Sequence, residues 1–128
     1  MTTFAVVYDA GALVAAERSD RMMWAIHRAY LTASVIPVVP APVVAQVSRS
    51  AKQVQLHRLL AGCEIAAFQA RDAHEVGRLL AKAKRADVVD AAVVCLALAR
   101  RAEIVTGDPD DLAALVAFAT TPPPLVVL

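Results

Sequence analysis

The chain has 128 residues, which is the size of one globular domain built around one hydrophobic core. Hydrophobic residues make up 59% of it and aromatic residues only 5%, so the core is expected to be aliphatic. Thirteen Lys and Arg against twelve Asp and Glu give a formal charge of +1, which excludes a strongly cationic module that binds nucleic acid through bulk electrostatics.

The excess of apolar residues predicts that part of the surface is covered by a second copy or by a partner, so we expect an oligomer. Cys63 and Cys95 lack the spacing of a zinc site and are expected to be small buried hydrophobic residues. The N-terminus does not have the pattern of a signal peptide. The apolar run over 35–45 contains three prolines and is too short to span a bilayer, so we expect a cytoplasmic protein without a membrane segment.

The first half of the chain alternates between strand and helix patterns. An apolar run over 4–8 predicts a buried strand that ends at Asp9 and turns into a helix. Helical spacing over 11–33 predicts two helices, the second capped by Asp20. A second strand is predicted over 36–39. Pro40 and Pro42 suit the first turn of a helix that runs to Ser50, and another helix is predicted over 52–61.

The second half continues the alternation. A strand is predicted over 64–68, then a helix that begins at Asp72 and ends in the cationic residues 82–85. Asp87 is placed to cap a strongly apolar helix over 88–100, which we expect to be buried on most faces. A strand over 103–106, a helix from Pro109 to Leu115 and a strand over 125–128 complete the chain. This order predicts a single three-layer α/β domain over 1–128, with a mostly parallel central sheet flanked by helices.

Three acidic residues occupy positions that parallel strands bring together. Asp9 and Asp108 each follow a predicted strand, and the carboxyl ends of parallel strands share one edge, where α/β proteins place ligands. Asp90 lies in the first turn of the buried helix, where the helix dipole stabilises an anion. Two carboxylates about 4 Å apart repel by about 4 kcal/mol at an effective dielectric constant of about 20, so a cluster needs shared protons or a cation. Because clustered Cys or His is absent from the sequence, oxygen ligands favour Mg²⁺ or Mn²⁺.

Helix capping is the alternative explanation for most of these residues. Asp9, Asp87 and Asp108 each precede a predicted helix, where Asp is a preferred N-cap. Asp90 is different, because it follows the cap and interrupts an apolar run, where a charged group needs a partner.

The acidic motifs, in their order along the chain, resemble those of PIN-domain ribonucleases, and most of all the VapC-type toxins of bacterial toxin–antitoxin pairs. The resemblance covers nearly the whole chain and rests on three motifs, Val-Tyr-Asp9, Asp87-Val-Val-Asp90-Ala-Ala-Val-Val and Ile104-Val-Thr106-Gly-Asp108-Pro-Asp-Asp111-Leu. It implies that Asp9, Asp90 and Asp108 match the first, third and fourth acidic positions of the family. It also implies that Asp111 is an accessory metal ligand, that Thr106 lies beside the site, and that Asp87 is a cap or supports the ligands.

The resemblance implies a Mg²⁺- or Mn²⁺-dependent endoribonuclease that cuts single-stranded RNA, with a cognate antitoxin as its protein partner. Substrate phosphates are expected at four basic residues, although a solvated charged surface is the alternative: Arg49, Lys52, Lys84 and Arg85. The helix that contains Met22, Met23 and Trp24 is consistent with a homodimer and with a surface covered by the antitoxin. The three histidines lie away from the acids in sequence and are not expected to be catalytic.

One position departs from the family pattern. The second acid of the family falls at Gln46, which keeps a carbonyl ligand but lacks the negative charge. Glu17 or Asp111 could replace that acid in space. The main alternative is therefore a PIN-like module that binds RNA or protein with weak or no cleavage. A phosphotransfer domain with Asp9 as nucleophile is disfavoured, because Asp9-Ala-Gly lacks a second Asp two residues later.

Overall fold

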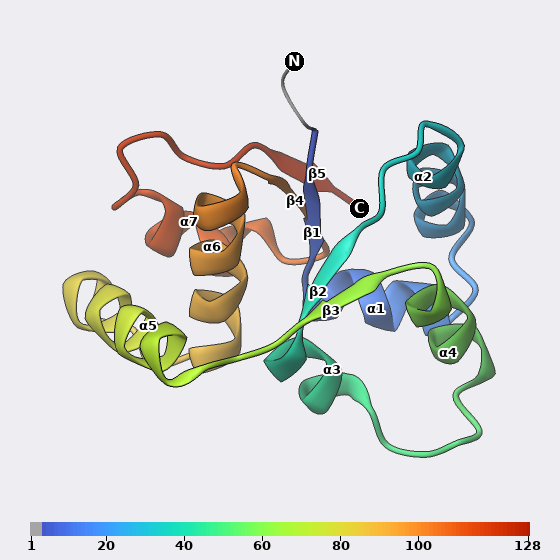
Figure 1. Cartoon of the computed structure of the whole chain (residues 1–128), viewed down its shortest axis with the longest axis horizontal. Coiled ribbons are helices and arrows are strands. Elements are labelled where there is room, and N and C mark those ends of the chain that lie inside the picture. Colours follow the sequence, from blue (N-terminus) through green and yellow to red (C-terminus); the bar gives the residue numbers. More distant parts are fainter. Residues whose placement is uncertain (1–3) are drawn as a thin grey trace.

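The computed structural model describes residues 4–128, so the first three residues of the N-terminus lie outside it. Five parallel strands form one sheet in the order β3-β2-β1-β4-β5. The strand order reverses between β1 and β4, because the chain moves from β1 to β2 and β3 on one side, then crosses to β4 and β5 on the other (Figure 1). The strands are β1 (Val6–Tyr8), β2 (Val38–Pro40), β3 (Glu64–Ala66), β4 (Glu103–Thr106) and β5 (Leu125–Val127).

Helices cover both faces of this sheet, which confirms the predicted three-layer α/β fold (Figure 1). One face is covered by α1 (Ala10–Glu17), α2 (Arg21–Thr32) and α4 (Val54–Ala61), the other by α5 (Ala70–Ala83), α6 (Val88–Arg100) and α7 (Pro109–Val116). The short α3 (Ala41–Val47) lies near the carboxyl ends of the strands and contacts both α1 and α6. None of the seven helices in residues 4–128 combines the length and apolarity needed to cross a membrane.

The core is aliphatic, as the composition predicts. Tyr8 is its only fully buried aromatic side chain within the described chain, and its hydroxyl group lies 2.9 Å from Nδ1 of buried His27. The helix α6 buries Ala91, Ala92, Val93, Val94 and Ala97, which confirms that it is central. Burial of these small apolar side chains against β1 and β4 fixes the position of the α6 N-terminus near the carboxyl edge of the sheet.

Several element ends differ from the predictions. Pro40 closes β2 in extended backbone and only precedes α3, which ends at Val47 rather than Ser50. Proline fixes φ but leaves ψ free, so it suits a strand end as well as a first helical turn. The helix α5 begins before Asp72, because Asp72 accepts the Gln69 N–H at 2.8 Å and forms a capping box.

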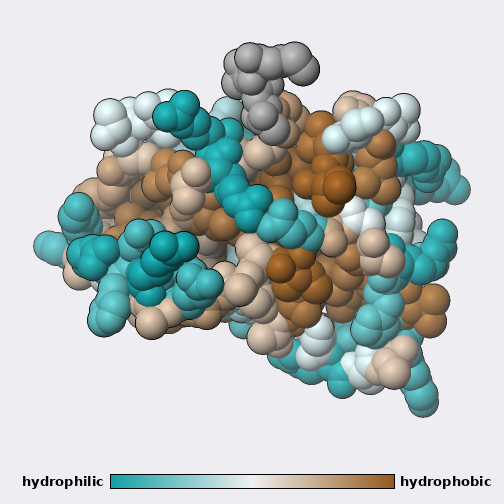
Figure 2. Space-filling model, viewed as in Figure 1, coloured by the Kyte–Doolittle hydropathy of each residue, from teal (hydrophilic) through white to brown (hydrophobic). Residues whose placement is uncertain are grey.

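Apolar side chains remain exposed outside this core. Figure 2 shows apolar surface on the face that presents β2 and β3. Ile36, just before β2, is 63% exposed, and Ile65 in β3 is 50% exposed. In α2, Met22 and Leu31 are exposed. The prediction for Met23 is wrong, because the helical phase turns it inward with His27. Trp24 is half-buried, and its indole N–H donates to the Ala16 carbonyl at 3.0 Å.

Glu17 caps a helix that follows it by nearly forty residues. Its Oε2 accepts the Leu56 N–H at 2.6 Å, at the N-terminus of α4, where Gln53 makes no side-chain cap bond. A carboxylate there compensates the unpaired amides and the positive end of the helix dipole.

We therefore expect Glu17→Ala to destabilise the fold by about 1–2 kcal/mol, measured by urea unfolding. Glu17→Gln keeps an acceptor and is expected to lose less than half of that. Equal losses for the two variants would contradict a capping role.

Candidate active site

Asp9 is the buried acid of the candidate site. It is 3% exposed, directly after β1, and its Oδ1 accepts the Ala12 N–H at 2.9 Å. Burial raises the pKa of this carboxyl group, the charge of Asp108 raises it further, and donors from Thr106, Ala12 and Gly107 oppose the rise. The capping role considered for Asp9 is thus confirmed, and it engages one of its two oxygens.

The end of β4 presents Asp108 beside Asp9. The fully buried Thr106 hydroxyl accepts the Asp108 N–H at 2.9 Å. Asp108 takes the N-cap position of α7 without a side-chain cap bond, so the capping explanation is wrong for its carboxylate, which is exposed. The two acids follow adjacent strands at the point where the strand order reverses, which is where α/β folds place ligands.

Asp90 is the residue on which the charges of the other acids act. It lies in the first turn of α6, and its N–H donates to Asp87 Oδ1 at 2.9 Å, which confirms Asp87 as the N-cap. Burial, together with four carboxylates, raises the pKa of Asp90 to about 6. These are the carboxylates of Asp87, Asp111, Asp9 and Asp108. The predicted acids therefore act on one half-buried carboxyl group.

These acids act on one another through their charges, but their side chains are not arranged as the ligands of one metal ion. Within residues 4–128, no three Asp, Glu, His or Cys side chains lie close enough together to hold one metal ion. The cluster also lacks a basic partner, because Arg100 with Glu64 is the only ion pair in the described part of the chain. Uncompensated carboxylates with oxygen-only donors fit a hard divalent cation such as Mg²⁺ or Mn²⁺.

Gln46 belongs to the helix that packs against both α1, which Asp9 caps, and α6, which contains Asp90. It is an exposed residue in the last turn of this helix, α3. Of the two acids considered as substitutes, Glu17 is engaged in capping α4, whereas the charge of Asp111 reaches Asp90.

The predicted phosphate-binding residues lie on two segments beside the carboxyl edge. Arg49 is exposed on the α3–α4 segment, and its guanidinium donates to the Ser48 carbonyl at 2.7 Å and the Ala45 carbonyl at 3.3 Å. Lys52 is exposed on the same segment, whereas Lys84 and Arg85 are exposed between α5 and α6 (Figure 1). Arg49 therefore already stabilises the end of α3, and the other three side chains reach solvent.

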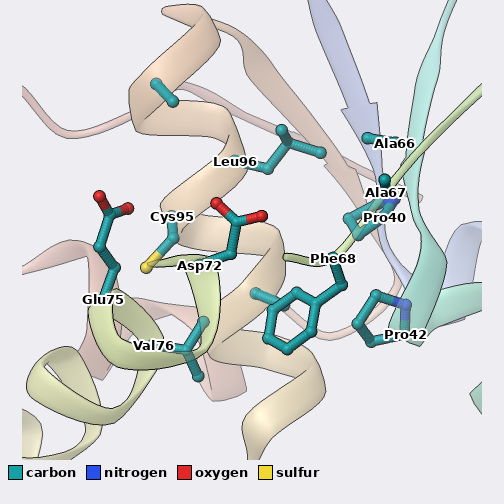
Figure 3. Close-up of a pocket in the computed structure, with 12 residues that line it drawn as sticks. Pro40, Pro42, Ala66, Ala67, Phe68, Asp72, Glu75, Val76, Cys95 and Leu96 are labelled. Atoms are coloured by element: carbon teal, nitrogen blue, oxygen red, sulfur yellow. The ribbon is translucent and has the colours of Figure 1, made fainter. Parts of the chain in front are cut away.

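An apolar pocket lies elsewhere on the molecule. Figure 3 shows it between α5, α6 and the ends of β2 and β3, with Phe68, Leu96 and Cys95 in its wall. Its lining includes none of the predicted metal ligands. It is therefore separate from the acidic cluster.

Two glycines that flank the predicted ligands were not identified from the sequence. Gly11 and Gly107 each lie within two residues of a predicted ligand, and their backbones are in contact. Only their position next to Asp9 and Asp108 in the sequence could have identified them.

Thr106→Val tests the link between β4 and the acids. Valine keeps the shape but removes the hydroxyl that accepts the Asp108 N–H and supports the Asp9 carboxylate. We expect a loss of about 1–3 kcal/mol of stability in thermal unfolding, because the partly buried Asp108 N–H loses its acceptor and the buried Asp9 carboxylate loses the Thr106 donor. Thr106→Ser keeps the hydroxyl, so it is expected to retain most of the stability. A valine variant as stable as the parent would contradict this role.

Comparisons with known proteins agree with this geometry. The PIN domain family model matches residues 6–118. A structure described as VapBC2 from Rickettsia felis bound to a DNA fragment from their promoter is similar, with a TM-score of 0.73 and 17% identity over 98% of this chain and 99% of that one. A toxin–antitoxin complex from Klebsiella pneumoniae gives a TM-score of 0.69 and 19% identity over 85% and 91%. The sequence matches none of the curated proteins. The solved structures share the fold, and the family match, which spans the acidic cluster, shows that this chain belongs to the PIN domain family.

Proposed function

We propose that this chain is a divalent-cation-dependent endoribonuclease and the toxin of a toxin–antitoxin pair. The observation that carries the proposal is the placement of Asp9 and Asp108 after adjacent strands, with Asp90 at the start of α6 and no basic partner for these acids in an ion pair among residues 4–128. Burial and four carboxylates together raise the pKa of Asp90 to about 6. Proteins of the PIN family are nucleases in general, and both solved neighbours are described with their antitoxins. An RNA substrate implies action in the cytoplasm.

In this proposal Asp9, Asp90 and Asp108, whose side chains are too far apart in this structure to hold one ion, would turn toward a shared Mg²⁺ or Mn²⁺, with Asp111 as an accessory ligand. When bound, the cation supplies charge stabilisation at the phosphoryl group and a more acidic water. A carboxylate of the cluster that is not bound to the cation orients the attacking water and accepts its proton. Thr106 and Asp87 hold the acids in place through the hydrogen bonds described above. Lys52, Lys84, Arg85 and Arg49 contact the phosphates of a single-stranded segment.

Cleavage of a single-stranded RNA by the partner-free protein tests the proposal. The parent is expected to cut with Mg²⁺ or Mn²⁺ and to stop with EDTA. Asp9→Asn and Asp108→Asn are expected to lower the rate at least about a hundredfold, because each removes a charge from the cation site. Asparagine is chosen because it is also a good N-cap, so α1 keeps its start in Asp9→Asn.

Asp110→Asn is the matched control for these variants. Asp110 is exposed in the first turn of α7, next to Asp111, but its charge is not among those that raise the pKa of Asp90. It is expected to cleave like the parent. Cleavage that survives EDTA, or equal rates for all four proteins, would refute the catalytic assignment.

A second candidate function is an RNA- or protein-binding module without cleavage. Gln46 favours it, because the charge that the family places there is missing. Binding of a non-cleaved RNA with metal, together with no cleavage by the parent, would support this candidate.

The proposed partners are an antitoxin and a second copy of the chain. Exposed apolar side chains over β2 and β3 supply a surface for one of them (Figure 2). Light scattering on the purified chain distinguishes monomer from homodimer. Growth arrest on expression, relieved by the protein encoded next to it, would support the toxin role.

A further inference from the structure

The N-terminus of α1 and the loop after β4 touch backbone to backbone. A Cβ atom added to Gly11 would lie 3.0 Å from both Cα and N of Gly107 and 3.4 Å from Asp9 Oδ1. Neither atom of Gly107 can rotate away as a side chain could, so the loop or the helix would have to shift. The contact therefore sets how close these two segments can come.

The requirement for glycine is steric and applies to only one of the two residues. Neither glycine has a positive φ, so neither backbone needs glycine for its conformation. A Cβ atom on Gly107 would meet Gly11 at 3.4 Å or more, which is ordinary van der Waals contact. Alanine should therefore be accommodated without movement at position 107, whereas at position 11 the facing backbone has to give by a few tenths of an ångström.

We propose that Gly11 is a positioning residue that sets the separation of the Asp9 and Asp108 carboxylates, and with it the affinity of the site for a divalent cation. Asp9 lies two residues before Gly11, and Asp108 directly follows Gly107, so a shift at this contact acts on both acids at short range. The Thr106 hydroxyl ties Asp108 to the same strand end, so the loop moves together with its acid. The effect on metal binding rests on the proposed function.

Gly11→Ala is compared with two alanine controls in the full chain. Gly107→Ala adds the same methyl group to the other side of the contact. Gly77→Ala adds it within α5, where nothing lies within 4 Å, and so reports the effect of helix propensity alone. The readouts are Mn²⁺ affinity by calorimetry, the backbone amide shifts of the metal-free proteins, and RNA cleavage as a function of Mn²⁺ concentration.

For Gly11→Ala we expect about a tenfold weaker Mn²⁺ affinity and displaced amide resonances of Gly107 and Asp108. Cleavage is expected to fall at low Mn²⁺ and to recover in part at high Mn²⁺, because the apparent KM for the cation rises more than kcat falls. Gly107→Ala and Gly77→Ala are expected to bind Mn²⁺ within twofold of the parent.

These measurements distinguish a failure of the positioning role of Gly11 from a failure of the proposed function. If the parent binds Mn²⁺ and Gly11→Ala binds it equally well, or if Gly107→Ala loses as much affinity, the positioning role is overturned. If the parent binds no Mn²⁺, the proposed function fails. In that case the amide resonances still test the positioning role, because they need no metal. Unchanged signals of Gly107 and Asp108 in Gly11→Ala would overturn it.

Discussion

Replacing Asp90 with Asn is expected to lower RNA cleavage at least about a hundredfold and, at the same time, to make the metal-free protein more stable at neutral pH. The loss of cleavage follows from the removal of a proposed cation ligand. The gain in stability follows because the half-buried Asp90 carboxylate is opposed by burial and by four like charges. After allowance for solvent screening, that gain is about 1 kcal/mol in the presence of EDTA.

The gain is expected to depend on pH in a defined direction. The pKa of Asp90 is raised from 3.8 in the unfolded chain to about 6 in the folded one, so the folded state binds this proton more tightly. The stability that the protonated carboxyl group contributes is therefore present below pH 4 and lost as the pH rises through about 6. The difference between Asp90→Asn and the parent should be small near pH 4 and largest at pH 7 and above.

Urea unfolding in EDTA at pH 4, 5.5 and 7 measures this difference. Added Mg²⁺ should raise the stability of the parent at pH 7 but leave Asp90→Asn nearly unchanged, because the ion stabilises only the state that binds it. Asp110→Asn again serves as the control and should follow the parent in both series. An asparagine variant that is less stable than the parent at pH 7 would show that Asp90 is a structural residue and not part of an uncompensated acidic cluster.

The sequence was sufficient to predict the fold because its local patterns agree with each other. Apolar runs end at Asp9 and Thr106, Asp20 and Asp87 cap their helices, and α6 has too few polar residues to lie on the surface. The element ends were less predictable. Pro40 has a backbone that fits a strand end as well as a helix start, and only the pairing with β3 decides between them.

The site was predictable in its members but not in its geometry. Parallel strands guarantee that Asp9 and Asp108 share an edge, but the distance between them depends on the contact between Gly11 and Gly107. Glu17 illustrates the same limit. Its carboxylate was a candidate substitute for the missing acid, and its actual role depends on α4 packing beside α1, which no local pattern specifies.

Gln46→Glu is expected to strengthen Mn²⁺ binding about tenfold and to raise cleavage at subsaturating metal. Glutamate has nearly the same length as glutamine, so the change adds a negative charge and a second carboxylate oxygen at the end of α3 with little steric cost. In the absence of metal the added charge should instead lower stability, because it joins a cluster that already repels itself. Opposite effects with and without metal are the expected signature of a position at the site.

Calorimetry with Mn²⁺, thermal unfolding in EDTA and RNA cleavage over a range of metal concentrations measure the three effects. Ala45→Glu is the matched control, because Ala45 is exposed on the same helix, one residue away and turned by about 100°. It should change neither metal affinity nor cleavage by more than about twofold.

An equal response of the two variants would mean that the added net charge alone causes the effect. No response to Gln46→Glu would place Gln46 outside the cation site. If cleavage appears only in Gln46→Glu, the parent is the binding module of the second candidate function, with an acidic site that lacks one charge for catalysis.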